Sequence, residues 1–211
     1  KKIPGSPIAY WVSDTIRSGF AQPCLDSQFD TRIGLQTGEN YLYVRLWHEV
    51  RHNKLGLGYK SRSKAKIDDS KKWFPYNKGG EFQKWYGNHG HIINWWKDGY
   101  DIKRDKQNRL SQGLIEKKNS ECWNQEYYFR ESISWSKISS GKIALRYYPS
   151  GFLFDVAGCS VFDDKTVKIW ILMGFLNSKV AFKMLEALSP TLNFEKGQIC
   201  RLPVLENEPV A

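Results

Sequence analysis

The stretch FLNSK at residues 175–179 lies within a longer apolar run, residues 169–188, that decides how the C-terminal part of the chain folds. Apolar residues recur in this run at steps of three and four, the spacing that lines one face of a helix. They are Leu172, Phe175, Leu176, Val180, Met184 and Leu188. A proline disfavours helix in the residue before it, so Ser189-Pro190 should end the run. The sequence therefore predicts one amphipathic helix over residues 169–188.

Two polar residues interrupt this run, and a turn follows it. Asn177 and Ser178 are interpreted as part of the packing of the helix, not as catalytic residues. The closing phrases PTLNF at residues 190–194 and GQICRLPV at residues 197–204 predict a turn and a return strand. Phe194 and Ile199 are expected to anchor that return.

Short strands precede the C-terminal run. Strands are predicted at residues 41–47, 92–96 and 143–148, which are rich in aromatic and β-branched residues. Gly-containing turns such as Gly79-Gly80 and Ser140-Gly141 separate them, and shorter helices are predicted at residues 81–86 and 104–108. This order predicts an α+β fold, with a mixed or antiparallel sheet of short strands, inserted helices and a C-terminal amphipathic helix.

The length and composition are those of a folded domain. The chain has 211 residues, of which 41% are hydrophobic and 15% aromatic, enough apolar surface to argue against disorder. We expect one domain over residues 1–205 and a tail or linker stub over residues 206–211. The four cysteines show no Cys-x-x-Cys pair, which predicts reduced, mostly buried thiols. No membrane-spanning run or signal peptide is apparent, so the predicted location is the cytoplasm of a bacterium or archaeon.

The charge of the chain favours a polyanionic partner. The formal net charge is +10, and residues 51–72 hold eight basic but only two acidic residues. This segment is also rich in Gly and Ser, which predicts a loop or ribbon. If the segment is extended, Lys60, Arg62, Lys64 and Lys66 project from one face as a phosphate track. The predicted phosphate contacts are Arg51, Lys54, Lys60, Arg62, Lys64 and Lys66; a solvated charged loop stays open as the alternative.

Two further segments are candidate nucleic-acid contacts. The cluster at residues 103–109 offers side chains that can pair with base edges, and its candidate base readers are Arg104, Gln107, Asn108 and Arg109. An exposed charged helix would explain the same residues. The glycine-containing stretch GLQTGEN at residues 34–40 resembles a phosphate-approaching loop but lacks the ending of a P-loop. Candidate loop contacts are Gln36, Thr37, Asn40 and Lys78.

Aromatic, histidine and acidic residues raise three weaker hypotheses: stacking of bases on aromatic rings, a metal site and nuclease chemistry. Among the nine tryptophans, Trp47, Trp135 and Trp170 lie in apolar patterns and are expected in the core. Trp85-Tyr86 and Trp95-Trp96 border polar loops and are the better candidates for exposure and base stacking, but packing is the favoured interpretation even for them. His89-x-His91 has no recognisable third and fourth ligand, so no metal is predicted. Asp155 has no convincing acidic partner for nuclease chemistry.

Several phrases in fixed order resemble a known family. They are IPGSPIAYWVS at residues 3–13, GLQTGEN at 34–40, WHEV at 47–50, KWFPYNKGGEF at 72–82, WYGN at 85–88, WS at 135–136, RYYPSG at 146–151, AG at 157–158, and the closing phrases above. Together they resemble the target recognition domain of PglX-like (BREX phage-defence) and type IIG adenine-specific DNA methyltransferases. The resemblance covers nearly the whole chain.

The resemblance implies a function in which this chain reads duplex DNA and another domain of the same polypeptide methylates adenine. The catalytic (Asn/Asp)-Pro-Pro-(Tyr/Phe) signature of the family is absent, since none of the eight prolines is paired with another. No enzymatic activity and no cofactor are therefore expected in this chain, whereas S-adenosylmethionine is expected in the parent protein. Because the chain starts at Lys1, it is interpreted as a domain excised from a longer methyltransferase.

Three partners are implied: double-stranded DNA, the methyltransferase domain of the same polypeptide, and other defence-system proteins. Two rival functions stay open. One is a module that binds single-stranded nucleic acid or RNA through its aromatics, and the other is a protein-docking domain of a defence complex. Preference among duplex DNA, single-stranded DNA and RNA distinguishes the first rival from the favoured function.

Overall fold

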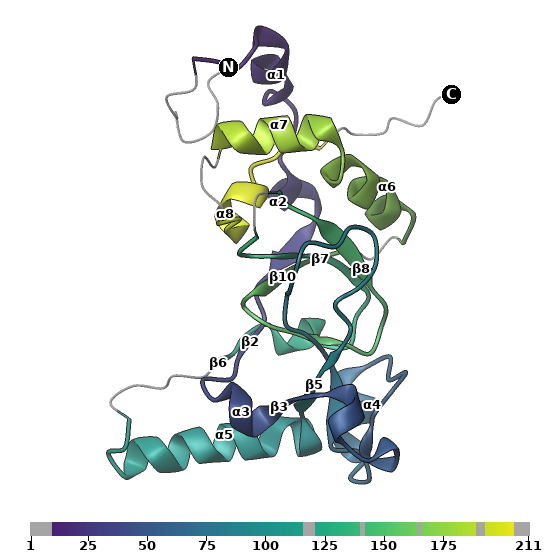
Figure 1. The fold of residues 1–211 in the computed structure, drawn as a ribbon, viewed down its shortest axis with the longest axis vertical. Helices are drawn as coiled ribbons and strands as arrows, with labels where there is room; N and C mark the ends of the chain where they lie inside the picture. Colours follow the sequence, from purple (N-terminus) through teal and green to yellow (C-terminus); the bar gives the residue numbers. More distant parts are fainter. Residues whose placement is uncertain (1–9, 116–120, 140–141, 164–165, 189–192, 205–211) are drawn as a thin grey trace.

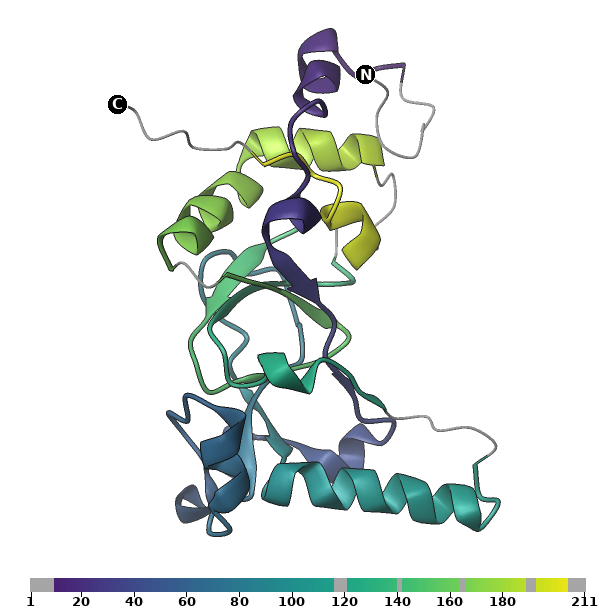
Figure 2. The same ribbon diagram turned by 180° about the vertical axis from the view of Figure 1, so that it is seen from behind.

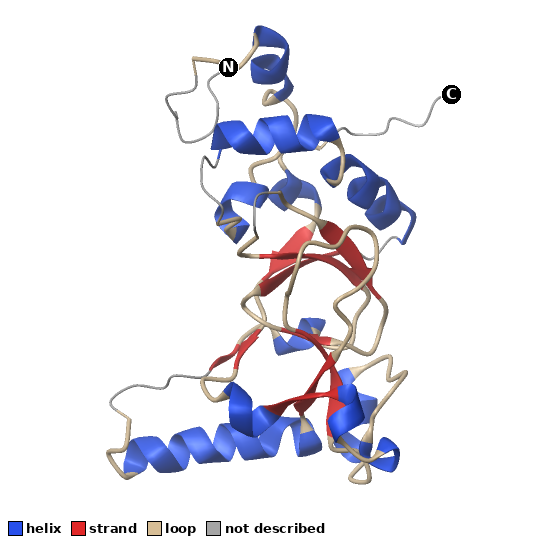
Figure 3. Ribbon diagram, viewed as in Figure 1, coloured by secondary structure: helices blue, strands red, loops and turns tan. Residues whose placement is uncertain are grey.

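The computed structural model describes residues 10–115, 121–139, 142–163, 166–188 and 193–204. It has an α+β fold, as predicted, in which helices accompany short strands of antiparallel and mixed sheets. The molecule is elongated: one group of helices lies at one end, a sheet lies beside it, and a second sheet with a long helix lies at the other end (Figure 1). Figure 3 shows that the strands occupy the middle of the molecule, with a short helix among them, and that the longer helices lie at its two ends.

The first sheet is antiparallel, in the order β1-β10-β7-β8. Its strands are β1 (Asp30–Arg32), β10 (Gly158–Phe162), β7 (Ser132–Ser136) and β8 (Leu145–Tyr148). The helices at this end are α1 (Asp14–Gly19), α2 (Leu25–Gln28), α6 (Thr166–Leu176), α7 (Lys179–Leu188) and α8 (Lys196–Ile199). The view from behind shows the same helices grouped beyond the sheet (Figure 2).

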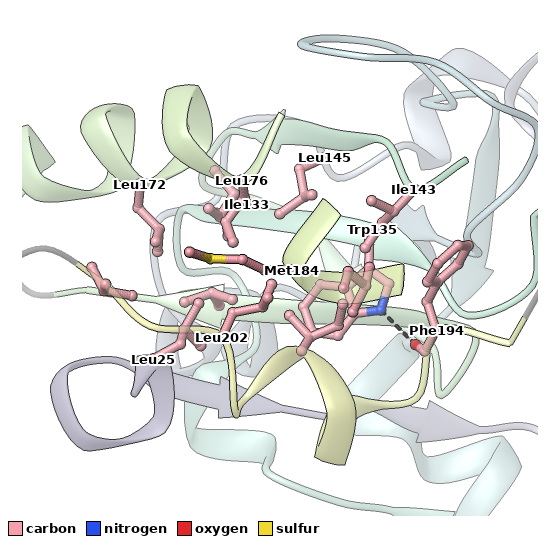
Figure 4. Close-up of a cluster of buried hydrophobic side chains, with 14 of the residues drawn as sticks. Leu25, Ile133, Trp135, Ile143, Leu145, Leu172, Leu176, Met184, Phe194 and Leu202 are labelled. Atoms are coloured by element: carbon pink, nitrogen blue, oxygen red, sulfur yellow. Dashed lines mark hydrogen bonds between the residues drawn. The ribbon is translucent and has the colours of Figure 1, made fainter. Parts of the chain in front are cut away.

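A hydrophobic cluster joins this sheet to its helices. Trp135 of β7 is fully buried at its centre, among side chains such as Leu172 of α6 and Met184 of α7 (Figure 4). The indole Nε1 of Trp135 donates a hydrogen bond to the carbonyl oxygen of Phe194 at 2.8 Å. A buried indole N–H needs a partner, so this bond fixes the segment before α8 against the sheet. Phe194 and Ile199 are both buried in this cluster, as predicted, but the return strand predicted there is wrong, because Lys196–Ile199 form helix α8.

The second sheet has the order β3-β5-β4-β9, antiparallel except for the parallel β4–β9 pair. Its strands are β3 (Val44–Leu46), β5 (His91–Asn94), β4 (Trp73–Asn77) and β9 (Leu153–Phe154), and β2 (Leu35–Gln36) pairs separately with β6 (Glu121–Cys122). The helices here are α3 (Asn40–Tyr43), α4 (Arg62–Ile67) and α5 (Trp96–Ser111), with short 3-10 turns η1 (Trp47–Glu49), η2 (His52–Lys54) and η3 (Gln125–Tyr127).

A second, aromatic-rich cluster fills this end of the molecule. Phe74 and Tyr76 of β4 and Trp95, which precedes α5, are all buried in it. Phe162 belongs to the same cluster although it lies on β10 of the first sheet. The two sheets are thus connected through side chains as well as through the chain.

The C-terminal amphipathic run is correctly predicted as helical but wrongly predicted as one helix. It forms α6 and α7, with Asn177 and Ser178 between them. Asn177 is buried, accepts a hydrogen bond from Leu145 N at 3.0 Å and donates one to Leu145 O at 2.9 Å. Ser178 Oγ accepts from Ala181 N in the first turn of α7. Because this break changes the helical phase, Val180 is 55% exposed instead of buried.

Other elements were predicted with mixed success. The strands at residues 92–96 and 143–148 are confirmed as β5 and β8 with shorter bounds, and the helix at residues 104–108 is confirmed within α5. The helix predicted at residues 81–86 is wrong, because Trp85 instead extends the edge of β8 through a parallel bridge with Arg146. The strand predicted at residues 41–47 begins as helix α3 and only then becomes β3.

Some predictions fall on residues outside the described part of the chain. They are the start of the first resemblance phrase at residues 3–9, the turn at Ser140-Gly141, the helix end at Ser189-Pro190, and the tail at residues 206–211. Among the helices that the structure describes, none is both long and apolar enough to cross a membrane.

Candidate nucleic-acid interface

The basic segment at residues 51–72 is not the extended ribbon that the sequence predicted. Residues 62–67 form helix α4, which Ser61 caps by accepting a hydrogen bond from Lys64 N. In a helix, residues two positions apart differ by roughly 200° in direction. Lys64 therefore points away from the face that Arg62 and Lys66 share, and the predicted single-face track is wrong in its geometry.

Arg62 is half-buried, and its guanidinium points toward Asp98 of α5. Its Nε and Nη2 donate to the two carboxylate oxygens of Asp98 at 2.6 Å each, and Nη2 also donates to Gln125 Oε1 at 2.6 Å. Lys103 adds a second cation, with its Nζ 3.0 Å from Asp98 Oδ2. Burial disfavours the charge of Asp98, but the hydrogen bonds from Arg62 and Lys103 outweigh it and lower the pKa of this carboxyl. This arrangement joins α4 to α5, so Arg62 has a structural role.

The remaining predicted phosphate contacts lie on the surface. Lys60, Lys64 and Lys66 are exposed around α4, and Arg51 and Lys54 are exposed around η2. The Nζ of Lys54 also donates a long hydrogen bond of 3.4 Å to Ser70 O. The fold therefore keeps five of the six cations accessible in one continuous segment, although not in a straight line.

Helix α5 carries the candidate base readers. Its first turn is left-handed, with positive φ at Lys97, Asp98 and Gly99, and the helix then runs along the far end of the molecule (Figures 1 and 2). Arg104, Gln107 and Asn108 are exposed, and their positions place them within roughly 100° of one another on the helix. The guanidinium of Arg104 lies 4.9 Å from the centre of the Tyr100 ring, which holds it along the helix surface.

Arg109 is separated from the other candidate base readers. Its Nη1 lies 2.6 Å from Glu39 Oε1, next to the start of α3. This hydrogen bond raises the pKa of Arg109 and lowers that of Glu39. The guanidinium thus links α5 to α3, whereas Arg104, Gln107 and Asn108 form an open polar face.

The segment at residues 34–40 is more ordered than a flexible glycine loop. A Cβ on Gly34 would lie 1.8 Å from the carbonyl oxygen of Phe154, so the close strand approach requires glycine. Thr37 is buried and donates a hydrogen bond of 2.5 Å to Asn40 Oδ1. Of the candidate loop contacts, Gln36 and Asn40 are exposed.

Lys78 neutralises a buried carboxylate. Its Nζ lies 2.6 Å from Asp155 Oδ2, and the hydroxyl of Tyr76 donates to the same oxygen at 2.5 Å. Asp155 therefore has a cation and a phenol as partners: Lys78 balances its negative charge, and the hydroxyl of Tyr76 satisfies it with a hydrogen bond. Among the described residues, no group of three His, Cys, Asp or Glu side chains could hold a metal ion.

The aromatic residues divide differently from the prediction. Trp135 is buried as expected, but Trp47 is 56% and Trp170 is 44% exposed. Trp85 and Tyr86 are exposed although packing was favoured for them, whereas Trp95 is buried as that interpretation predicts. The burial predicted for Trp47 is wrong because Trp47 begins the 3-10 turn η1, whereas the strand predicted through residue 47 ends at Leu46.

A cavity near the other end of the molecule was not foreseen. It has a volume of about 460 Å³, lies at the junction of α6 and α7, and is lined by Lys84, Lys142, Lys179 and Lys183 around apolar side chains. These lysines come from three separate parts of the sequence. Because no local pattern connects them, only the fold reveals the cluster.

Comparison with known proteins identifies two similar sequences, while no protein-family model matches the chain. The chain is 41% identical over 206 residues to the adenine-specific methyltransferase PglX of Lacticaseibacillus casei (strain Zhang). It is 36% identical over 211 residues to the adenine-specific methyltransferase BrxX of Escherichia coli O9:H4 (strain HS). The matches cover 97% and 98% of this chain, but it spans only 16% of the length of each relative.

Proposed function

We propose that this chain is the target recognition domain of a PglX-like adenine-specific DNA methyltransferase that acts in phage defence. The observation that carries the proposal is similarity along almost the whole chain to a region of two adenine-specific methyltransferases. In this proposal residues 1–205 form the recognition domain and contact duplex DNA. The methyltransferase domain of the same polypeptide is its covalent partner.

The distribution of side chains supports a DNA-reading role. Reading a duplex requires cations for the phosphates and polar side chains for the base edges. The exposed Lys60, Lys64 and Lys66 can serve the first need, and the open face of Arg104, Gln107 and Asn108 can serve the second. Both sets lie at the same end of the molecule, because α4 and α5 are joined through Arg62 and Asp98.

The chemistry of methylation belongs to the parent protein in this proposal. The exocyclic amine of adenine is stacked inside the duplex, so the base must be flipped out before a methyl group can reach it. S-adenosylmethionine would bind in the other domain, whereas this chain would hold the neighbouring base pairs and select the adenine. The resulting methylation would mark the DNA of the host cell.

A region exchange tests whether specificity is carried by this chain. We would insert the 211 residues in place of the corresponding region of Lacticaseibacillus casei PglX and, separately, of Escherichia coli BrxX. Methylated adenines would then be mapped across the genome of a common host. We expect both chimaeras to modify the same sequence, because both carry the same reader.

The unmodified PglX and BrxX serve as controls and define the site of each parent. If each active chimaera still modified its parent's site, this chain would not determine the sequence. A triple variant that replaces Arg104, Gln107 and Asn108 with other, uncharged side chains would be placed in the same chimaera. It would show whether α5 takes part in selecting the methylated sequence.

A further inference from the structure

The loop between β4 and β5, residues 78–90, is a rigid structure on the first sheet. It leaves the second sheet, passes over β7 and β8, and returns to β5 (Figure 1). Ser136 Oγ donates to Gly80 O at 2.7 Å, and Lys84 Nζ donates to Asn177 O at 2.8 Å. Backbone hydrogen bonds join Trp85 N to Leu145 O and Tyr147 N to Trp85 O, both at 2.9 Å. The loop is therefore fixed at several points along its length.

A buried arginine supports the loop from below. Arg146 of β8 is fully buried, although an arginine side chain is costly to bury. Its guanidinium donates to Ser136 Oγ at 2.6 Å and to Gln83 O at 3.4 Å, and its Nε donates to Tyr148 OH at 3.4 Å. These bonds hold the residues immediately before Trp85 against the sheet.

The fixed loop displays aromatic side chains to solvent. Trp85 has a φ of +73°, which is unfavourable for a residue other than glycine, yet its side chain is 51% exposed. Tyr86 is 66% exposed, and its ring packs on His89 with the ring centres 4.4 Å apart. The backbone is thus held in a strained conformation that leaves a large indole uncovered. Such strain is consistent with selection for contact with a partner.

The lysine-lined cavity adjoins this loop. Lys84, the residue before Trp85, lines the cavity together with Lys142, Lys179 and Lys183. Among the acidic residues nearby, Glu186 pairs with Lys183 at 2.7 Å, and Glu81 is exposed on the loop itself. The cations exceed these carboxylates, so a ligand here would carry negative charge as well as flat apolar groups.

We propose that Trp85 and Tyr86 pack against the bases of duplex DNA while the lysine-lined cavity receives a neighbouring backbone phosphate. The proposal rests on the function proposed above and adds a second contact surface, distant from the predicted base readers on α5. DNA supplies both chemistries: a phosphate on every nucleotide and flat base and sugar surfaces next to it. Apolar side chains of minor-groove binders insert between base steps in this way.

Replacement of the two aromatic residues tests the contact with bases. Trp85→Gly removes the indole and suits the positive φ, so the backbone of the loop should be retained and thermal stability should not fall. Together with Tyr86→Ala, it should weaken duplex binding by the 211-residue chain about tenfold or more. Trp11→Ala is the matched control, because Trp11 is 58% exposed but lies near α1. It should leave affinity unchanged.

A fluorescent base distinguishes stacking from general weakening of affinity. The fluorescence of duplexes that carry 2-aminopurine at successive positions would be measured without protein and with a saturating concentration of the wild-type chain. We expect a change in 2-aminopurine fluorescence at one or two adjacent positions, because contact with the indole alters the stacking of the base. The same positions should show no change with Trp85→Gly at a concentration that saturates the DNA.

Neutralisation of the cavity tests the binding of phosphate. Lys142→Gln and Lys179→Gln remove two exposed cations and spare Lys84, which bonds to the backbone of Asn177. The double variant should bind duplex DNA more weakly. The slope of log affinity against log salt should become shallower by about 0.9 for each phosphate that the variant no longer neutralises.

The outcomes separate this inference from the proposed function. If wild type binds duplex DNA but the aromatic and lysine variants bind equally well, the second surface is refuted and the recognition function stands. If wild type prefers single strands, or an acidic peptide competes for the surface and DNA does not, duplex contact through Trp85 is refuted. If wild type binds no DNA, the inference and the proposed function both fail for this chain.

Discussion

Replacement of Arg62 should destabilise the protein, whereas replacement of the neighbouring Lys64 should not. Arg62→Gln removes three hydrogen bonds of 2.6 Å, two of them to a carboxylate whose side chain is only 10% exposed. Removing one partner of a buried ion pair destabilises proteins by about 3–5 kcal/mol. Lys103 remains 3.0 Å from Asp98, and Arg62 itself is 36% exposed. We therefore expect a smaller effect, about 2 kcal/mol in the free energy of unfolding.

Thermal and chemical unfolding measure this difference. A destabilisation of about 2 kcal/mol corresponds to a decrease of about 4–8 °C in Tm for a chain of this size. Lys64→Gln is the matched control: its side chain is exposed on the same helix, so its free energy of unfolding should change by less than about 0.5 kcal/mol. The effects on DNA binding should be the reverse of the effects on stability. Lys64→Gln should reduce the dependence of DNA affinity on salt, whereas Arg62→Gln, measured below its Tm, should not. A stable Arg62→Gln variant with impaired DNA binding would refute the structural role of Arg62.

Three further predictions concern the packing and the charges of the fold. Gly34→Ala should destabilise the protein by about 3 kcal/mol or more in urea unfolding, because the added Cβ would meet Phe154 O at 1.8 Å. Gly174→Ala is the control: it lies in α6, its added Cβ would have no atom within 4 Å, and it should stabilise the protein by about 0.5–1 kcal/mol. Asn177→Ala should cost about 1–3 kcal/mol in the same assay, because it leaves the Leu145 N–H without its acceptor while Leu145 O keeps the hydrogen bond from Trp85 N, and a cost below about 1 kcal/mol would contradict this. The pKa of Asp98 is lowered on folding, so its contribution to stability is complete above the unfolded pKa of about 3.9 and is lost as pH falls through the lower folded value. Tm measured from about pH 6 to about pH 2 should therefore converge for wild type and Asp98→Asn at the acid end, and a constant difference would contradict the assignment.

Local patterns predicted the class of the fold but not its breaks. The three- and four-residue spacing in residues 169–188 correctly indicated helix, and the aromatic run at residues 143–148 correctly indicated a strand. The division into α6 and α7 depends on the bonds between Asn177 and Leu145, which are 32 positions apart in sequence. No local pattern contains such a contact.

The candidate site shows the same limit. Composition located the basic segment, and most of its cations are exposed as expected. The role of Arg62 depends on Asp98 and Gln125, which only the folded chain brings near α4. Trp85 was a candidate for exposure for which packing was favoured, and its exposure, its strained backbone and the adjoining lysine cavity required the tertiary structure.

Binding of duplex DNA by this chain is the property on which the proposed recognition function depends. It is measured as the affinity of the purified chain for duplex DNA, single-stranded DNA and RNA of the same sequence across a salt series. We predict tightest binding to the duplex and a log affinity that falls linearly with log salt, with a slope of about −0.9 for each phosphate contacted. The slope should be shallower when Lys60, Lys64 and Lys66 are replaced by glutamine. Equal or tighter binding to single strands, or no binding to any of the three nucleic acids, would contradict the recognition function.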